Sequence, residues 1–251
     1  MNTRLPQNSN EKRYFQSSYR GLPVIDYRGP LVEGYLEKIH QTIESSLNQY
    51  PRVFATRFDL MFPADIQSWS SKVISRFLDH FKSIVVSHLR SQGLKPEKCQ
   101  PRVVWAKERN CSMNYHYHVL LLLNRDVFHT SGRLGSENLN IISRIESAWA
   151  KALDLSFEQV QGLVHFPANR DYKLDRNSPD FYVQLADLFY RASYLAKEES
   201  KAYGDGSRHF SCSQGNRSAN GFDMAQHARR SLDAMIQARD ERVLMAGGLN
   251  K

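Results

Sequence analysis

Two histidines separated by one residue are the strongest sign of chemistry in this sequence. His116 and His118 stand at the head of the apolar run 119–123, which is too short to cross a membrane and is typical of a buried central strand. Side chains alternate along a strand, so we expect both imidazoles on the same face of the sheet. Two adjacent imidazoles can hold one metal ion; hydrogen-bonded sheet histidines are the alternative interpretation.

Two imidazoles leave a metal ion short of ligands. Glu108 is the best third candidate, because it ends the preceding predicted strand, across a polar turn from His116. If Glu108 pairs with His116, its carboxylate joins the histidines, whereas a slip of one residue sends it to the other face. Asp59 and His165 are the fallback ligands, and a solvated glutamate at a turn is the alternative. Imidazole ligands suit zinc and manganese better than magnesium.

A second group of reactive side chains follows on a helix predicted from about residue 180 to 201. At 3.6 residues per turn, Tyr190, Tyr194 and Lys197 fall within about 60° of one another, opposite the apolar arc of the helix. A tyrosine hydroxyl can attack phosphorus and form a covalent intermediate. A free phenol ionises with a pKa of about 10, so it needs a neighbouring cation at neutral pH. An ordinary half-exposed face, with a cation beside an aromatic ring, is the alternative.

The predicted elements place these two groups in a mixed fold. Apolar patterns, prolines and glycines indicate the order β-α-β-β-α-β followed by a helix, a short edge strand and a last helix, at residues 53–60, 65–93, 102–108, 114–124, 136–153, 162–166, 180–201, 208–212 and 223–245. This order predicts an α+β fold with a ferredoxin-like central antiparallel sheet of about five strands. We expect helices packed mainly on one face, leaving the other free to carry the site.

Three regions are predicted along the chain. Residues 1–50 form an N-terminal extension with one helix, whose first 29 residues are polar and expected to be peripheral; 51–221 form the catalytic domain; and 222–251 form a C-terminal helix and tail.

Composition narrows the partner and the compartment. The chain has 251 residues, a net charge of +8 and a sequence pI of about 9.4, which favours a polyanionic partner. No apolar stretch has the length of a membrane span, and the first residues lack the apolar core of a signal peptide. Three cysteines form no CxxC pair, so a reducing, cytoplasmic setting is the simplest expectation.

The two motifs, in this order and on these elements, resemble the HUH endonucleases, the superfamily of replication initiators and relaxases. The His-hydrophobic-His motif corresponds to residues 116–118 and the Tyr-x-x-Lys motif to 194–197, while residues 54–58 occupy the place of a less specific first-strand motif. Tyr190 with Tyr194 further resembles the two-tyrosine initiators of phage rolling-circle replication. More narrowly, residues 51–221 resemble inovirus-type and prophage replication proteins grouped under the YagK/YfjJ C-terminal domain. Tyr117 departs from the usual aliphatic residue, but it faces away from the metal.

The resemblance implies an HUH-type fold and a metal-dependent, site-specific endonuclease and strand transferase for single-stranded DNA, which initiates rolling-circle replication of a phage or prophage element. Tyr194, which carries Lys197 three residues on, would cut the strand and keep the 5′ phosphate. Tyr190 would accept a strand in a second transesterification. Mg²⁺ or Mn²⁺ would be held by the histidine pair and Glu108.

The implied partner is single-stranded or hairpin DNA at a replication origin, with a host helicase as a further candidate and no membrane. Phosphate contacts would make DNA binding strongly salt-dependent. The candidate DNA-binding residues are basic side chains expected around the site, each of which could also be merely solvated: Arg57, Lys107, Arg109, Lys173, Arg176, Arg208 and Arg217.

Three other functions compete with the nickase. A ferredoxin-like sheet is also the architecture of RRM domains, which bind RNA without catalysis, but the sequence has no RNP1 pattern and that fold does not call for paired histidines. An inactive relative could serve as a phage regulatory protein. A small-molecule metallohydrolase would need an open metal position but no aligned tyrosine pair.

Overall fold

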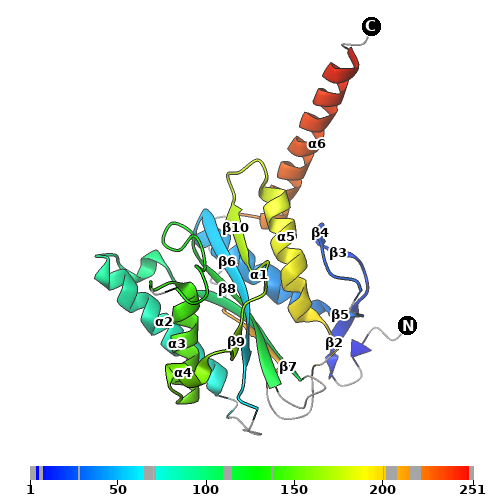
Figure 1. Cartoon of the computed structure of the whole chain (residues 1–251). Coiled ribbons are helices and arrows are strands. Elements are labelled where there is room, and N and C mark those ends of the chain that lie inside the picture. The colour runs from blue at the N-terminus through cyan, green and yellow to red at the C-terminus, as the bar shows by residue number, and fades with distance from the viewer. Residues whose placement is uncertain are drawn as a thin grey trace.

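An antiparallel sheet forms the centre of the computed structural model (Figure 1). The structure describes residues 4–5, 8–27, 29–64, 70, 72–109, 115–136, 138–199, 201, 208–214 and 222–248, with the side chains of 240–248 left aside. The sheet has six strands in the order β10-β6-β8-β7-β11, with β9 paired to β6: β6 (Arg52–Met61), β7 (Arg102–Arg109), β8 (Tyr115–Asn124), β9 (Val164–His165), β10 (Asp171–Asp175) and β11 (Phe210–Cys212). The prediction of a mixed α+β chain with an antiparallel sheet is confirmed.

Helices cover both faces of this sheet, so the expectation that one face stays free was wrong. Helices α2 (Val73–Ser91) and α3 (Ile141–Leu153) pack on one face with the short α4 (Phe157–Val160), and α1 (Glu33–Gln49) and α5 (Phe181–Ser193) pack on the other. Each face has its own apolar core. The sequence itself indicated this, because residues 119–123 are all apolar, and a strand whose side chains do not alternate between apolar and polar is buried on both faces.

The register of the central strands decides which side chains meet. In β8, His116, His118, Leu120 and Leu122 point toward α1 and α5, while the intervening residues join the core under α2 and α3. Tyr117 therefore faces away from the histidines, as predicted. Glu108 of β7 lies opposite His116, and Asp59 of β6 lies opposite His118. The hairpin thus has the register that places the Glu108 carboxylate on the histidine face.

Helix α5 ends earlier than predicted. Its last residue is Ser193; a 3₁₀ turn, η2 (Tyr194–Ala196), follows, and Lys197 adopts an extended conformation. The cause is a long-range contact, because Lys197 forms a β-bridge with Leu31. The prediction that the α-helix continues to about residue 201 is therefore wrong, although the Lys197 ammonium still reaches the Tyr194 hydroxyl.

The described residues before α1 form strands and add side chains to the core, so the expectation that this segment is peripheral was wrong. Strands β1 (Arg4–Leu5), β2 (Asn8–Tyr14) and β5 (Leu31–Val32) form a small sheet, and β3 (Ser18–Tyr19) pairs with β4 (Leu22–Pro23). Apolar side chains of this segment and of α1 share the core beneath α5. The region boundaries at residues 50 and 221 remain predictions.

The last helix, α6 (Met224–Gly248), starts against α5 and then projects away from the body (Figure 1). No helix within the described residues is both long and apolar enough to cross a membrane.

One buried histidine makes the stability of the fold depend on pH. His40 on α1 meets the stacked rings of Tyr19 and Phe189 edge to face, and burial, aided by the nearby Arg20 charge, lowers its pKa to about 4. The unfolded chain takes up this proton at a pKa of about 6.5, so the folded state loses stability as pH falls from about 6.5 to about 4. We expect His40→Gln to remove of the order of 3 kcal/mol of this pH dependence, measured by urea unfolding. His129→Gln, at an exposed histidine, is the matched control and should keep the wild-type profile; equal profiles for the two variants would contradict this account.

Candidate metal and phosphate site

Three side chains from the central hairpin converge on one point. The Nε2 atoms of His116 and His118 are 3.1 Å apart, and a Glu108 carboxylate oxygen lies 3.2 Å from the His118 Nε2. The ligand atoms of this cluster all lie within 4.8 Å of one another, and all three residues are buried. The cluster is therefore compatible with a bound metal ion.

A second carboxylate orients His118 from behind. Asp59 Oδ1 lies 2.5 Å from the His118 Nδ1, and Arg57 contacts the same carboxylate at 3.1 Å. A carboxylate accepts a hydrogen bond, so the Asp59 contact favours a proton on Nδ1, although Arg57 Nη2 also lies 2.9 Å from that atom. A bound metal ion would then take the place of any proton on Nε2, the atom that faces Glu108. Although burial alone would raise the pKa of Asp59, its contacts with His118 and Arg57 hold that pKa well below its ordinary value. Asp59, one of the two fallback ligands, thus orients a ligand rather than binding a metal itself. The other, His165, reaches the Asp59 carboxylate at 3.2 Å and belongs to no metal-ligand cluster among the described residues.

His116 fits the same interpretation. Burial, followed by the charge of His118, lowers the pKa of His116 to about 4, so its ring is neutral at pH 7. Its buried Nδ1 has no hydrogen-bond partner among the described residues. When Nε2 of His118 carries a lone pair, the facing Nε2 of His116 either donates to it or shares a cation with it. Two imidazoles beside a carboxylate form the donor set that a divalent transition metal accepts.

Tyr194 lies beside this cluster. Its ring meets the His118 ring edge to face with centroids 5.2 Å apart, and its hydroxyl accepts a hydrogen bond of 2.9 Å from the Lys197 ammonium. Arg57 lies over the same ring, 5.4 Å from its centroid. The structure thus brings together the imidazole pair and one phenol, from elements more than seventy residues apart in the sequence.

Lys201 is a member of the site that the sequence analysis missed. Its ammonium donates to Glu108 Oε1 at 2.8 Å, while Lys197 pairs with Oε2 at 2.9 Å. Burial opposes the charge of Glu108, but His118 and Lys201 outweigh it and hold the pKa of Glu108 well below normal. Burial also lowers the pKa of Lys201, whereas the contacts with Tyr194 and Glu108 overcome burial and raise that of Lys197. A lysine among acidic neighbours at 198–199 gave no signal of this role.

Arg57 and Asp59 did carry a signal. Both interrupt an otherwise apolar strand at alternate positions, so they had to share one face. Two charges on one face of a buried strand require partners, and the partners here are His118 and each other.

Tyr190 is not part of this cluster. It lies on α5 with 40% of its surface exposed, and its ring makes no hydrogen bond or ring contact with any described residue. The paired-tyrosine role remains a prediction for Tyr190.

The predicted DNA-binding residues are scattered. Arg57 is at the site, but Lys107 and Arg109 alternate with Glu108 and contact the Tyr115 ring on the opposite face. Lys173 is exposed on β10, and Arg176 lies at the far end of the sheet. Arg208 lies in the segment before β11, and Arg217 falls outside the described residues. Their contacts with DNA remain predictions.

The site carries a net positive charge in a buried setting. Three cations, Arg57, Lys197 and Lys201, face two carboxylates, and the histidine His116 is neutral at pH 7. A further anion with several oxygens would balance this excess, and a phosphodiester has that chemistry.

Comparisons with known proteins agree on a family. The YagK/YfjJ C-terminal domain family matches residues 15–213. Among curated proteins, the uncharacterized protein YagK of Escherichia coli K12 is 35% identical over 193 residues, covering 72% of this chain and 92% of that protein. The uncharacterized protein YfjJ of the same organism is 30% identical over 201 residues, covering 74% and 97%.

A search of solved structures found a weak likeness to the N-terminal nuclease domain of non-structural protein 1 of minute virus of mice. It has 8% identity and a TM-score of 0.21, and covers 74% of this chain and 76% of that one. A likeness at this level carries no argument about fold or function. The family match and the two relatives do: this chain belongs to the YagK/YfjJ C-terminal domain family.

Proposed function

We propose that this protein is a metal-dependent HUH endonuclease that nicks and rejoins single-stranded DNA through a covalent 5′-phosphotyrosine bond. One observation carries the proposal: the Tyr194 hydroxyl, held by the Lys197 ammonium, stands against His118 of the Glu108–His116–His118 cluster. A nucleophile, a cation and a metal-ligand set share one small volume. None of the competing functions needs all three together.

Tyr194 supplies the nucleophile. An ammonium that donates to a phenol oxygen favours the ionised phenol, and Lys197 holds that position at 2.9 Å. In the proposed step the phenol oxygen bonds to phosphorus while the bond from phosphorus to the 3′ oxygen breaks. The phenol proton leaves to solvent and the 3′ oxygen takes one up. One phosphodiester replaces another, so the reverse step rejoins the strand.

The metal ligands complete the proposal. A bound Mg²⁺ or Mn²⁺ would polarise a non-bridging phosphate oxygen as a Lewis acid. Glu108, His116 and His118 would hold it, Asp59 would keep the His118 ring in the ligating tautomer, and Lys201 would keep the Glu108 carboxylate ionised. Strand order supports the HUH-type, ferredoxin-like fold: the β-α-β-β-α-β core of β6, β7, β8 and β10 has the last strand beside the first.

The biological role we propose is initiation of rolling-circle replication for a phage or prophage element in the cytoplasm, with origin DNA as substrate and a host helicase as partner. The net charge of +8 suits a polyanionic substrate.

A regulatory protein that binds DNA without cutting it is the second candidate. The observation that favours it is the pairing of Glu108 with two lysines, which neutralises this carboxylate without a metal ion. Metal binding and covalent adduct formation separate the two functions.

Metal binding should depend on the three clustered residues and on Asp59, which orients His118. We expect His116→Ala, His118→Ala and Glu108→Gln each to weaken Mn²⁺ binding at least about 100-fold, and Asp59→Asn to weaken it about 10–100-fold because it frees the His118 ring. Isothermal titration calorimetry on the apo protein measures this. His165→Ala is the matched control and should bind like wild type, because His165 is outside the cluster and Asp59 keeps its contacts with His118 and Arg57 without it. A wild-type protein that binds no Mn²⁺, Mg²⁺ or Zn²⁺ would exclude the metal site.

Covalent chemistry should depend on Tyr194. The probe is a randomised pool of single-stranded oligonucleotides, labelled at the 3′ end and incubated with protein and Mn²⁺. On a denaturing gel the 3′ label should migrate with the protein, because Tyr194 keeps the 5′ phosphate of the downstream fragment. Tyr194→Phe should form no adduct. Lys197→Met should lower the yield of adduct at least about 100-fold, because the lysine stabilises charge that develops in the transition state.

Tyr190→Phe tests the second tyrosine. We expect it to keep the first adduct, because its ring does not contact the cluster. An adduct that survives Tyr194→Phe but is lost in Tyr190→Phe would show that Tyr190, and not Tyr194, is the nucleophile. DNA binding without an adduct under any metal would support the regulatory function instead.

A further inference from the structure

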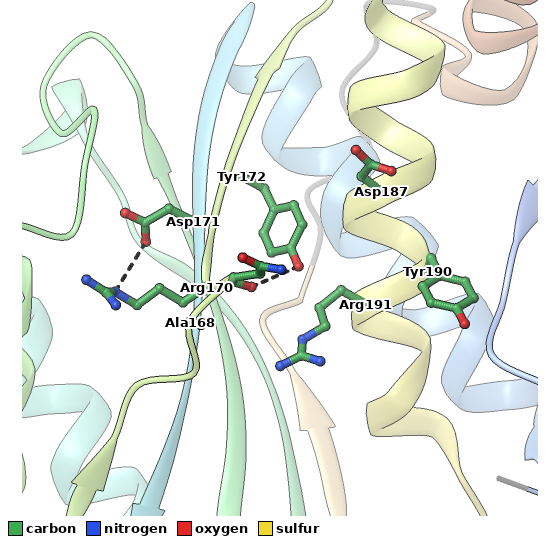
Figure 2. Close-up of a pocket in the computed structure, with 8 residues that line it drawn as sticks. Ala168, Arg170, Asp171, Tyr172, Asp187, Tyr190 and Arg191 are labelled. Atoms are coloured by element: carbon green, nitrogen blue, oxygen red, sulfur yellow. Dashed lines mark hydrogen bonds and ion pairs between the residues drawn. The ribbon is translucent and has the colours of Figure 1, made fainter. Parts of the chain in front are cut away.

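A polar cavity lies beside the proposed cleavage site. It has a volume of about 660 Å³ and is bordered by β10 with the residues before it and by α5. Figure 2 shows Tyr172 on the strand side and Asp187 and Arg191 on the helix. The volume is that of a pocket for a small organic group. No step proposed above uses these three side chains.

Arg191 enters the cavity without a partner. Its buried Nε has no hydrogen-bond partner, and its guanidinium forms no ion pair with any described residue. Asp187, four residues earlier on the same helix, also forms no hydrogen bond or ion pair within the described chain. Residues at this spacing are neighbours on a helix surface, yet these two are not joined. Asp187 is exposed, whereas the buried Arg191 Nε is a donor without an acceptor, which is costly. This wall of the cavity is therefore suited to a polar ligand.

Tyr172 supplies an aromatic wall. It is half-buried on β10, and its hydroxyl donates to the Asn169 carbonyl at 3.0 Å, which fixes the ring. Its charged neighbours are Arg191, Arg57 and Asp187. The Tyr190 ring, in contrast, points to the other side of α5, although Tyr190 borders the cavity (Figure 2).

The cavity and the cleavage site are connected through Arg57. The Arg57 backbone donates to the Arg170 carbonyl at 2.9 Å on the cavity wall, and the Arg57 guanidinium lies over the Tyr194 ring. Arg191 also precedes Tyr194 by three residues, or roughly 5 Å along the helix axis. Arg57 is also a charged neighbour of Tyr172 on the cavity wall, so a strand whose phosphate reaches Tyr194 would have a neighbouring nucleotide within reach of this cavity.

We propose that the cavity binds one unpaired base of single-stranded DNA next to the scissile phosphate, and that this base is guanine. This inference rests on the proposed function. Arg191 would donate to the O6 and N7 acceptors of guanine, the pairing that guanidinium groups make most often in DNA recognition. Asp187 would accept from the N1–H and N2–H₂ donors, and the base would stack on Tyr172. Guanine alone among the four bases offers both an acceptor pair and a donor pair.

A binding assay tests the base preference without cleavage. The protein is Tyr194→Phe with Mn²⁺, so the strand stays intact, and the probes are fluorescein-labelled oligothymidylates with one internal dG, dA, dC or no substitution. Fluorescence anisotropy should give about tenfold tighter binding for the dG probe. Equal affinity for the four probes would overturn the inference.

Three further substitutions locate the preference. Arg191→Lys keeps the charge but loses the planar fork, and Asp187→Asn loses the carboxylate, so each should abolish the dG preference while binding of plain oligothymidylate changes little. Tyr172→Leu should weaken binding to all four probes, because stacking is tolerant of sequence. Arg90→Lys, at an exposed arginine on α2, is the matched control and should keep the preference. A dG preference that survives both Arg191→Lys and Asp187→Asn would place guanine elsewhere and refute the assignment.

The adduct assay separates failure of this inference from failure of the proposed function. If the wild-type protein forms the Tyr194 adduct but shows no base preference, only the guanine pocket is refuted. If the dG preference depends on Arg191 and Asp187 but no adduct forms, the pocket stands and the nickase is refuted.

Discussion

The buried carboxylate of Glu108 is the charge on which the site depends. It is 1% exposed, and it faces His118 and two lysine ammonium groups. A buried carboxylate without such partners would be protonated, and its neighbours would then lose their anchor. Strand β7 contributes Glu108, strand β8 the histidines, and the segment after α5 the lysines. One ionised group therefore holds three separate parts of the chain at a common point.

The fold supplies rigidity for this arrangement by burying the sheet on both faces. Trp149, Phe77 and their neighbours fill the face under α2 and α3, and apolar residues of α1 and α5 fill the other. The polar cluster lies at the edge of the second core, where β8 begins and α5 ends. Because the histidines sit on a strand that is fixed from both sides, their rings have little freedom to move apart.

Local patterns predicted most of the sheet and half of the site. Alternation placed His116 and His118 on one face, and the polar turn before β8 made the pairing of Glu108 with His116 available. The unbroken apolar run 119–123 also indicated that both faces of the sheet are covered. The end of α5 and the role of Lys201 depended on contacts between distant segments, such as the bridge from Lys197 to Leu31. Helix starts also shifted: α3 begins after Asn140 rather than near residue 136, because Asn140 and Ser143 cap it reciprocally. Periodicity cannot report such contacts, since they join residues far apart in sequence.

The bridge between Lys197 and Leu31 has one more consequence. The next residue, Glu198, receives a hydrogen bond pair from Arg13 at 2.6 Å and donates its backbone N–H to the Pro30 carbonyl. The turn that carries Tyr194 is therefore held by hydrogen bonds to the N-terminal sheet and its flanking residues, as well as by its own helix. The position of the Tyr194 phenol therefore depends on three residues near the amino terminus, Arg13, Pro30 and Leu31, none of which touches the metal-ligand cluster among the contacts of the described residues.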